Sequence, residues 1–378
     1  MNVMIVVTHL LGTGHLARAL NLARAFQDAG HTVTVVSGGM PVPLLDRGDV
    51  PLVQLPALRA DGVDFSRLLD ADGTPADPAL LNARKAQILD EFEQLCPEVL
   101  ITELFPFGRR TLRHEFSALL EAADARADRP LICASVRDIL APPSSLGKAE
   151  KTHSIVDRFY DAVLVHADPQ VIQLDASWPV SDSLRSKLHY TGFIAPTAAA
   201  SHSEQVGKDE IIVSAGGGDV GAHIFSTALR AALSGGRVWR LLIGGAQADR
   251  RIAQWRADAP ANIIIEAARP DFRSLLPHAA ASVSMCGYNT AIDVLQAGCK
   301  SVFIPFDAGA EVEQTIRANA LAQLPGIEVL PSADLTPDSL LDALSRLAPL
   351  PERAGVRTGF DGAAETVRRV AMLRTQTA

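Results

Sequence analysis

Short apolar segments alternate with amphipathic helical patterns along this chain, and the alternation starts twice with the same design. In the first half, a strand candidate at 1–10 leads into Gly12 and Gly14 and then into a helix at 14–29. In the second half, a strand and glycine loop at 211–221 precede a helix at 222–234. Strands that are apolar almost throughout and alternate with helices indicate parallel sheets covered on both faces. We therefore predict an α/β protein built from two Rossmann-like domains that face a cleft.

A break in this pattern divides the chain, whose 378 residues are enough for about two domains. Between the halves, small, polar and proline-containing residues replace the periodic pattern, as they do in interdomain linkers. We predict a first domain at 1–192, a linker at 193–209, a second domain at 210–360 and a separate C-terminal segment at 361–378.

The remaining elements follow from hydrophobic periodicity, because strands and helices repeat their buried positions with different spacing. The Asp-, Gly- and Pro-rich segment 58–80 is predicted as a loop. The other predicted strands lie at 31–39, 98–103, 130–136, 161–168, 238–245, 262–267, 281–287 and 300–306, and the other predicted helices at 79–95, 109–126, 249–257, 288–297, 311–323, 338–347 and 361–374.

Composition and charge exclude several classes of protein. Hydrophobic residues make up 48% and charged residues 21%, so the chain has the apolar material for sizeable cores. A formal net charge of −8 argues against binding duplex nucleic acid over the whole surface. The four cysteines form no CxxC motif, and we interpret them as buried reduced thiols. Because no apolar run is long enough to span a bilayer and the N-terminus is typical of a strand rather than a signal peptide, we expect a cytoplasmic protein, with peripheral contact at the inner membrane face left open.

The segment Gly12-Thr13-Gly14-His15 lies between the first strand and the first helix. Glycines let the backbone approach a ligand, and a helix N-terminus offers free N–H groups. The motif is neither GxGxxG nor a P-loop, so packing of an ordinary strand–helix turn is the alternative explanation. His15 follows a strand end, where open α/β sheets bind ligands, and a helix N-terminus favours the neutral imidazole that a general base needs. The alternative is a capping or packing histidine.

Two further strand ends in the first half carry polar groups. Glu103 ends the strand at 98–103, and Arg109 follows it; Arg109 pairs with Glu103, binds an anionic acceptor or faces solvent. Asp138 follows the strand at 130–136 and is a candidate to orient His15 as the acid of a His–Asp pair. The catalytic candidates are therefore His15, Asp138 and Glu103, and the acceptor-side candidates are Gly12, Gly14 and Arg109.

Between Glu103 and Arg109 the chain reads Leu-Phe-Pro-Phe-Gly, with more arginines following. The aromatic residues Phe105 and Phe107 either contact an anionic membrane or acceptor, or form an internal aromatic plug. The pair Asp70 and Asp72 spells a DxD motif, which can mark a metal-dependent sugar-nucleotide site. Because it lies in a segment predicted as loop and not at the end of an apolar strand, we interpret it as solvated acid and predict no metal site.

The strongest binding signals in the second half are two strand-to-helix junctions. Gly216, Gly217 and Gly218 follow an apolar strand and open a helix, which suits backbone binding of an anion such as a diphosphate. The alternative is a flexible turn. At the other junction, Gly287 precedes a helix that carries Asn289, Thr290 and Asp293 on one face near its N-terminus. A carboxylate there can accept both hydroxyls of a ribose, although an ordinary helix cap explains the same residues.

Several of these motifs together resemble the MurG-like glycosyltransferases of the GT-B fold, and more closely the bacterial predicted glycosyltransferases related to MurG. The resemblance covers essentially the whole chain and rests on TELFPFGRR (102–110), VRDIL (136–140), RPDF (269–272), CGYNTAIDVL (286–295) and EQTIRANAL (313–321). Three departures stand out: a shorter N-terminal glycine loop, Asp293 where glutamate is usual, and a Glu313-Gln314 pair in place of two glutamines.

The resemblance implies a division of labour between the domains. The first domain takes a hydroxyl acceptor, the second a nucleotide sugar, usually a UDP-sugar, and the closing helix at 361–374 returns to the first domain. It implies that the nucleobase lies near Arg269 and Phe272, the diphosphate near Gly216, Gly217, Gly218 and residues 287–290, the ribose at Asp293, and the sugar hydroxyls near Glu313 and Gln314.

We therefore expect an inverting, metal-independent glycosyltransferase that needs no cofactor and binds no nucleic acid. His15 would remove the acceptor proton while backbone amides and helix N-termini stabilise the leaving diphosphate. One alternative is a sugar-nucleotide 2-epimerase-like enzyme of the same fold, which needs no acceptor site. Another is a non-catalytic subunit that binds sugar nucleotides and needs a partner.

Overall fold

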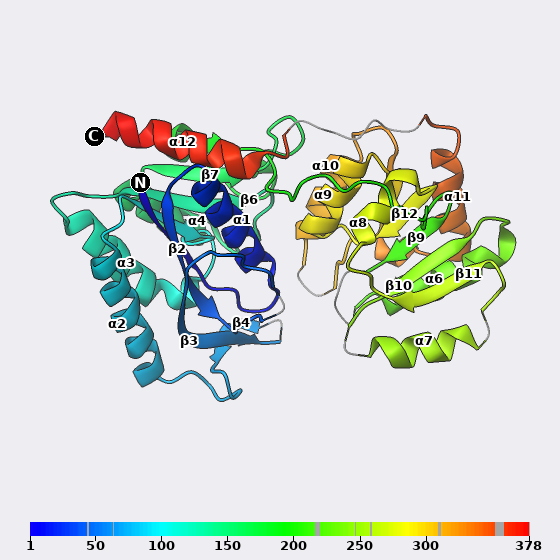
Figure 1. Cartoon of the computed structure of the whole chain (residues 1–378), viewed down its shortest axis with the longest axis horizontal. Helices are drawn as coiled ribbons and strands as arrows, with labels where there is room; N and C mark the ends of the chain where they lie inside the picture. The colour runs from blue at the N-terminus through cyan, green and yellow to red at the C-terminus, as the bar shows by residue number, and fades with distance from the viewer. Residues whose placement is uncertain are drawn as a thin grey trace. The chain divides into compact units, whose positions relative to one another are not determined.

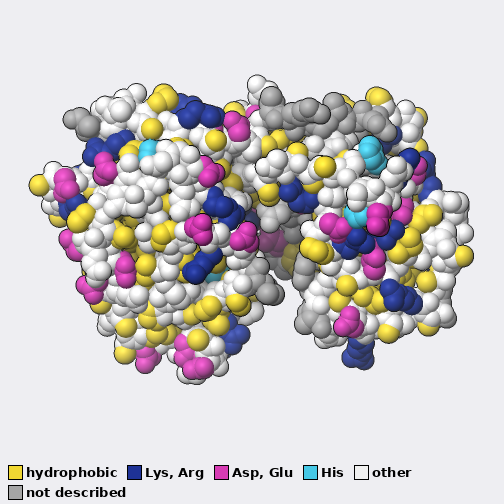
Figure 2. Space-filling view, viewed as in Figure 1, with side chains coloured by type: hydrophobic (Ala, Val, Ile, Leu, Met, Phe, Trp, Pro, Cys, Tyr) yellow, Lys and Arg dark blue, Asp and Glu magenta, His cyan; other side chains and the backbone are white. Residues whose placement is uncertain are grey.

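The computed structural model describes residues 1–43, 45–62, 64–215, 220–245, 247–257, 259–308, 311–351 and 359–377. The chain divides into two compact units, one formed by Met1–Ile194 with Gly359–Ala378 and the other by Ala195–Thr358. Each unit is an α/β layer structure around one sheet, as the alternation of strands and helices predicts. Basic and acidic side chains are interspersed over the visible face of both units (Figure 2).

The first unit contains an eight-stranded sheet in the order β4-β3-β2-β1-β5-β6-β7-β8. Neighbouring strands are parallel except for the edge pair β3 and β4. The strands are β1 (Asn2–Val7), β2 (Thr32–Gly39), β3 (Leu52–Asp61), β4 (Asp64–Leu69), β5 (Val99–Glu103), β6 (Leu131–Arg137), β7 (Ala162–His166) and β8 (Leu188–Tyr190).

Helices cover both faces of this sheet. On one face, α1 (Gly14–Asp28) and the C-terminal helix α12 (Gly362–Thr377) pack together over side chains such as Ile5 and Ile101 (Figure 1). Helices α2 (Pro78–Leu95) and α3 (Arg113–Ala125) lie side by side elsewhere in the unit, joined by a buried Arg84–Glu115 ion pair. The unit also contains α4 (Leu146–Phe159) and α5 (Asp182–Lys187).

The predicted loop at 58–80 is wrong over its first half. Residues 52–61 and 64–69 form the β3–β4 hairpin, which extends the sheet beside β2. Antiparallel edge strands tolerate polar residues on their solvent side, so Asp and Arg in this segment hid the strand pattern. Asp70 and Asp72 do lie in a turn after the hairpin, where the Asp70 carboxylate accepts hydrogen bonds from backbone N–H groups.

The second unit contains a six-stranded parallel sheet in the order β11-β10-β9-β12-β13-β14, the doubly wound arrangement of dinucleotide-binding domains. Its strands are β9 (Ile211–Ser214), β10 (Trp239–Ile243), β11 (Ile263–Ala267), β12 (Ala281–Ser284), β13 (Ser301–Phe303) and β14 (Ile327–Val329), and its helices are α6 (Ala222–Ala231), α7 (Ala248–Arg256), α8 (Phe272–Leu275), α9 (Tyr288–Ala297), α10 (Glu313–Leu321) and α11 (Pro337–Leu347).

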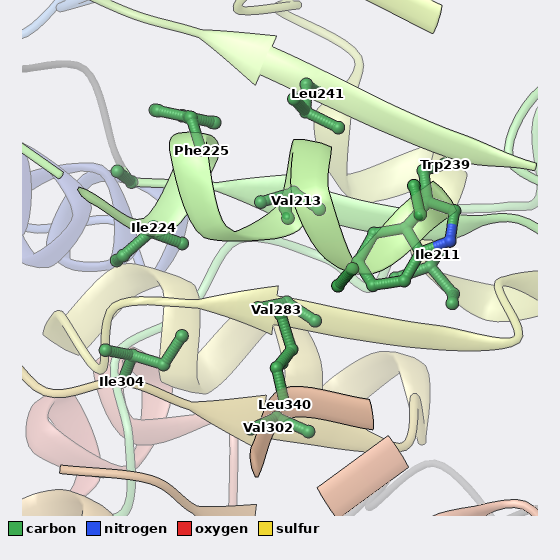
Figure 3. Close-up of a cluster of buried hydrophobic side chains, with 14 of the residues drawn as sticks. Ile211, Val213, Ile224, Phe225, Trp239, Leu241, Val283, Val302, Ile304 and Leu340 are labelled. Carbon is green, nitrogen blue, oxygen red and sulfur yellow. The ribbon is translucent and has the colours of Figure 1, made fainter. Parts of the chain in front are cut away.

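A buried apolar cluster fills one side of this sheet. Val213 and Leu241 from the central strands pack with Phe225 of α6 and Leu340 of α11 (Figure 3). Burying several side chains of this size contributes about 1.5–3 kcal/mol each. The other side of the sheet carries a smaller cluster of Ile212, Leu242 and Leu275. Because all neighbouring strands are parallel, their carboxyl ends lie at one edge of the sheet, where each strand leads into the loop that follows it.

Candidate functional site

The site in the first unit begins at the carboxyl end of β1, where the chain turns into α1. His15 is the second residue of α1, and its side chain is 16% exposed. Neither Gly12 nor Gly14 has a positive φ, and a Cβ built on either would meet no atom within 4 Å. Packing within the described residues therefore does not demand glycine at these two positions. Close approach of a ligand remains a physical reason for glycine here.

His15 contacts a carboxylate from the neighbouring strand. Its Nδ1 lies 2.9 Å from Oε1 of Glu103, the last residue of β5, and Glu103 is 1% exposed. Arg18, one turn further along α1, binds the same Glu103 oxygen through Nη2, which also lies 3.0 Å from His15 Nδ1. A buried carboxylate is thus held between a guanidinium and an imidazole, which offsets the cost of burying its charge.

The charges around this cluster fix the protonation states. Burial raises the pKa of Glu103, but Arg18 and the hydrogen bond from His15 outweigh it and hold that pKa well below its usual range. Burial, together with the nearby cations Arg18 and Arg109, lowers the pKa of His15 to about 3 against the opposing effect of Glu103. Neutral His15 therefore faces ionised Glu103 at neutral pH. Because an ionised carboxylate only accepts hydrogen bonds, His15 Nδ1 carries the proton that it donates to Glu103, and Nε2 keeps a lone pair for a ligand.

Three further buried residues extend this cluster, and the sequence interpretation missed all of them. Ser135 at the end of β6 bonds to Glu103, His166 at the end of β7 bonds to Ser135, and Thr191 after β8 bonds to His166. A signal was present in the sequence. In three strands, every second residue is apolar until a polar residue takes the last position of the series. The series are Val99, Ile101 and Glu103; Leu131, Cys133 and Ser135; and Ala162, Leu164 and His166.

Asp138 does not take the role that we predicted for it. The carboxylate next to His15 is that of Glu103, whereas Asp138 is 1% exposed and accepts a hydrogen bond from the Ile139 backbone N–H. The strand order explains the difference, because β5 lies directly beside β1 and β6 is one strand further away. Sequence alone shows two acidic residues at strand ends, but the order of the strands decides which one meets His15.

Arg109 is half-buried, and the two phenylalanines before it are buried. Arg109 does not pair with Glu103, which is occupied by Arg18; its Nε donates to the Thr8 carbonyl at 2.5 Å. Phe105 and Phe107 are 1% and 2% exposed, so these two rings form an internal plug and not a membrane contact. Phe105 stacks on Phe116 of α3, with ring centroids 4.5 Å apart.

In the second unit, the described residues predicted to bind the donor follow the strands β11, β12 and β13. Gly287 caps α9, and no acidic residue occupies the first turn of that helix. The buried Arg317 of α10 donates to the Cys286 carbonyl at 3.0 Å, which ties α10 to the start of α9. Asn289 is exposed and Thr290 is half-buried in the first turn of α9. The predicted Gly216, Gly217 and Gly218 lie outside the described residues.

Asp293 has a protein partner in this structure. Its Oδ1 accepts a hydrogen bond from Arg273 Nε at 2.8 Å, and Arg273 also donates to the Gln296 side chain at 2.8 Å. Burial raises the pKa of Asp293 to about 6 even though Arg273 opposes the shift. A carboxylate that is costly to keep ionised gains from hydroxyl donors, so hydroxyl groups of a ligand would stabilise its charged form.

The other donor candidates also have partners. Gln314 accepts a hydrogen bond from the Phe306 N–H at 3.1 Å, and the Glu313 N–H donates to the Glu311 carboxylate at 2.7 Å. Arg269 binds Asp271 through two hydrogen bonds, and half-buried Phe272 packs on the smaller core cluster. The side chains of Arg269 and Phe272 therefore both have contacts within the protein.

A pocket lies apart from these residues. It has a volume of about 450 Å³ and opens at the amino edge of the second sheet, beside Arg237, His278 and Lys300, and thus opposite the predicted donor loops. Across the part of the chain that the structure describes, no three His, Cys, Asp or Glu side chains group as a metal site. None of the described helices has both the length and the apolar character required to cross a membrane.

Comparison with known proteins adds a family to this geometry. Residues 241–358 match the glycosyltransferase family 28 C-terminal domain. The matched residues lie within the second unit. The match contains every predicted donor residue that the structure describes, from Arg269 to Gln314. A comparison with curated protein sequences gives no match.

Solved structures similar to the whole chain have the GT-B fold. MurG of Acinetobacter baumannii is 17% identical with a TM-score of 0.64, over 98% of this chain and 100% of that one. The glycosyltransferase VinC in complex with dTDP is 17% identical with a TM-score of 0.65, over 100% of both chains. CalG4, the calicheamicin glycosyltransferase, is 15% identical with a TM-score of 0.65, over 100% of this chain and 99% of that one. The family 28 match and this fold together indicate a glycosyltransferase, similar in architecture to MurG.

Proposed function

We propose that this glycosyltransferase is an inverting enzyme that needs no metal and transfers a sugar from a nucleotide sugar, in the first instance a UDP-sugar, to a hydroxyl acceptor. The observation that carries the proposal is the His15–Glu103 pair at the carboxyl end of β1, where Nδ1 and Oε1 lie 2.9 Å apart. A neutral imidazole fixed through Nδ1 to an ionised carboxylate is the arrangement that a general base requires.

The chemistry assigns one task to each group. The acceptor hydroxyl attacks the anomeric carbon, the bond to the diphosphate breaks, and His15 Nε2 takes the hydroxyl proton. Its imidazole becomes positively charged during this step, and the adjacent Glu103 carboxylate stabilises that charge. Because Glu103 is paired with Arg18 beforehand, its charge is in place before the reaction starts and costs no reorganisation during it.

The donor half of the proposal rests on the loops of the second unit. The leaving diphosphate gains negative charge, and the N-terminus of α9 at Gly287 offers backbone N–H groups and a positive helix end. We assign the ribose hydroxyls to Asp293, whose pairing with Arg273 they would share or replace. Glu313 and Gln314 are assigned to the sugar hydroxyls, because they begin the helix that Arg317 ties to the start of α9.

A nucleotide-sugar panel tests the donor half directly. The protein is titrated with UDP, dTDP, GDP and their sugars, with and without EDTA, by calorimetry and thermal shift. Binding of one nucleotide diphosphate and its sugar, unchanged by EDTA, supports the proposal and identifies the donor. No binding by any nucleotide sugar would overturn the donor assignment.

The catalytic half is tested by diphosphate release from that donor, with water and with a panel of hydroxyl acceptors. The wild-type protein is compared with His15→Ala and, as a matched control, with His114→Ala, which removes an exposed histidine of α3. His15→Ala should abolish release and leave the donor Kd unchanged. Full turnover in His15→Ala would refute its role as the base, and epimerised donor without transfer would favour the epimerase alternative.

A further inference from the structure

The hydrogen bonds around Glu103 form one continuous buried chain across the carboxyl ends of β5, β6, β7 and β8. Ser135 Oγ lies 2.5 Å from Glu103 Oε2, His166 Nε2 lies 2.9 Å from Ser135 Oγ, and Thr191 Oγ1 lies 2.8 Å from His166 Nδ1. None of the four side chains is more than 3% exposed. Successive hydrogen bonds in a buried series of this kind strengthen one another when every polar group has a partner.

Sheet geometry explains why these residues meet. Glu103 lies directly opposite Ser135 in the parallel β5–β6 register, and His166 is diagonal to Ser135 across β6–β7. All three stand on the face covered by α1 and α12, because their strands place Ile101, Cys133 and Leu164 on that face two residues earlier. The hydrogen bonds from Ser135 and His166 therefore reach Glu103 from the β6 side, opposite to His15 and Arg18.

The direction of every proton in the chain follows from simple counting. An ionised carboxylate only accepts hydrogen bonds, so the single proton of Ser135 points to Glu103. Ser135 Oγ must then accept from His166 Nε2–H. Burial lowers the pKa of His166 to about 3, so its ring is neutral and its Nδ1 carries a lone pair, which accepts from the Thr191 hydroxyl. Each donor is directed toward Glu103.

We propose that Ser135, His166 and Thr191 are positioning residues that hold the Glu103 carboxylate ionised and oriented, so that Oε1 faces His15 and the free base nitrogen of His15 is Nε2. This inference rests on the proposed role of His15. With Oε2 bound to Ser135, the carboxylate cannot rotate without breaking a buried charge-assisted bond. Its Oε1 then receives Arg18 Nη2–H and His15 Nδ1–H together.

The first test needs no substrate and no variant. Long-range ¹H–¹⁵N spectra of the histidine rings report which nitrogen carries the proton in each imidazole. The proposal requires the Nε2–H tautomer for His166 and the Nδ1–H tautomer for His15 at pH 7. An Nδ1–H tautomer of His166 would reverse the chain, and an Nε2–H tautomer of His15 would remove its base nitrogen; either result overturns the inference.

The second test removes hydrogen bonds from this buried series by substitution at two residues. Ser135→Ala removes the donor to Glu103, and Thr191→Val removes the far hydroxyl in an isosteric side chain; Thr191→Ser restores that hydroxyl. Thr152→Val is the matched control, since Thr152 is buried in the same unit and bonds to backbone carbonyls. We expect kcat for diphosphate release to fall about tenfold in Ser135→Ala and about threefold in Thr191→Val, at unchanged KM for the donor.

A titration separates positioning from general damage to the fold. Loss of the Ser135 donor makes the Glu103 carboxylate more basic, so the pKa of His15 should rise in Ser135→Ala and stay unchanged in Thr152→Val. The other charges that face His15, Arg18 and Arg109, are the same in both variants. An unshifted His15 titration with unchanged kcat in Ser135→Ala would refute the positioning role. Correct tautomers together with full activity of His15→Ala would refute only the proposed function.

Discussion

Replacing Glu103 by Gln is the most informative single change in the first unit. The substitution keeps the shape of the side chain and removes its negative charge. Glu103 is 1% exposed and contacts Arg18 and His15 through the same oxygen, so water cannot solvate these two groups in place of the lost carboxylate. Two effects follow: the imidazolium that forms on His15 loses its counter-charge, and the buried Arg18 guanidinium loses its partner.

Both effects have a calculable size. With charge centres about 4 Å apart and an effective dielectric constant of about 20, the imidazolium and carboxylate attract by about 4 kcal/mol. Losing that attraction in the transition state lowers kcat by about 10³-fold. Leaving Arg18 buried without its partner costs about 3–5 kcal/mol of folding free energy.

The stability effect has a defined pH dependence. The folded pKa of Glu103 lies below its ordinary value, so the ion pair stabilises the protein above about pH 4.5 and loses that contribution as the pH falls through the lower folded value. The difference in unfolding free energy between wild type and Glu103→Gln should therefore shrink on acidification. Urea denaturation at pH 7 and at pH 3 measures this difference.

The assay is release of nucleoside diphosphate from the bound donor. Glu98→Gln is the control, because Glu98 directly precedes β5 and its side chain is half-exposed. Adding Arg18→Met to Glu103→Gln removes the orphaned charge, so the double variant should regain stability and remain inactive. Glu103→Gln with wild-type kcat would refute the reasoning about His15. A double variant no more stable than the single one would refute the ion-pair argument.

Three further substitutions test other parts of the structure. Asp293→Asn should weaken donor binding, measured by calorimetry. The folded pKa of Asp293 is about 6 and its ordinary value about 4, so the wild-type protein loses free energy of unfolding as the pH rises from 4 to 7. In urea titrations over that range, the variant should therefore gain about 2–3 kcal/mol relative to wild type. Arg84→Met leaves the buried Glu115 unpaired and should lower the free energy of unfolding by about 3–5 kcal/mol, whereas an equally stable variant would show that the pair contributes nothing. Gly221→Ala should cost about 2 kcal/mol or more in thermal denaturation, because Gly221 has a φ of +85° and an added Cβ would lie 2.3 Å from Ala215; an unchanged melting temperature would contradict this crowding.

Local pattern was sufficient for most of the fold. The predicted strands at 1–10, 31–39 and 98–103 correspond to β1, β2 and β5, and the predicted helix at 14–29 to α1. These elements are apolar runs or amphipathic stretches whose periodicity is independent of their neighbours. The β3–β4 hairpin was missed, because an edge strand with a solvent-exposed face lacks that pattern.

What the sequence determined by itself is the kind of groups available at the strand ends: His15, Glu103 and Asp138 in the first unit and Asp293 in the second. What only the tertiary structure decided is which of them meet. The β1–β5 pairing puts Glu103 and not Asp138 beside His15, and packing brings Arg18, Ser135 and His166 around that carboxylate. The physical reason is that a strand-end residue is specified locally, whereas its partners depend on strand order and helix placement, which arise from contacts between segments far apart in the chain.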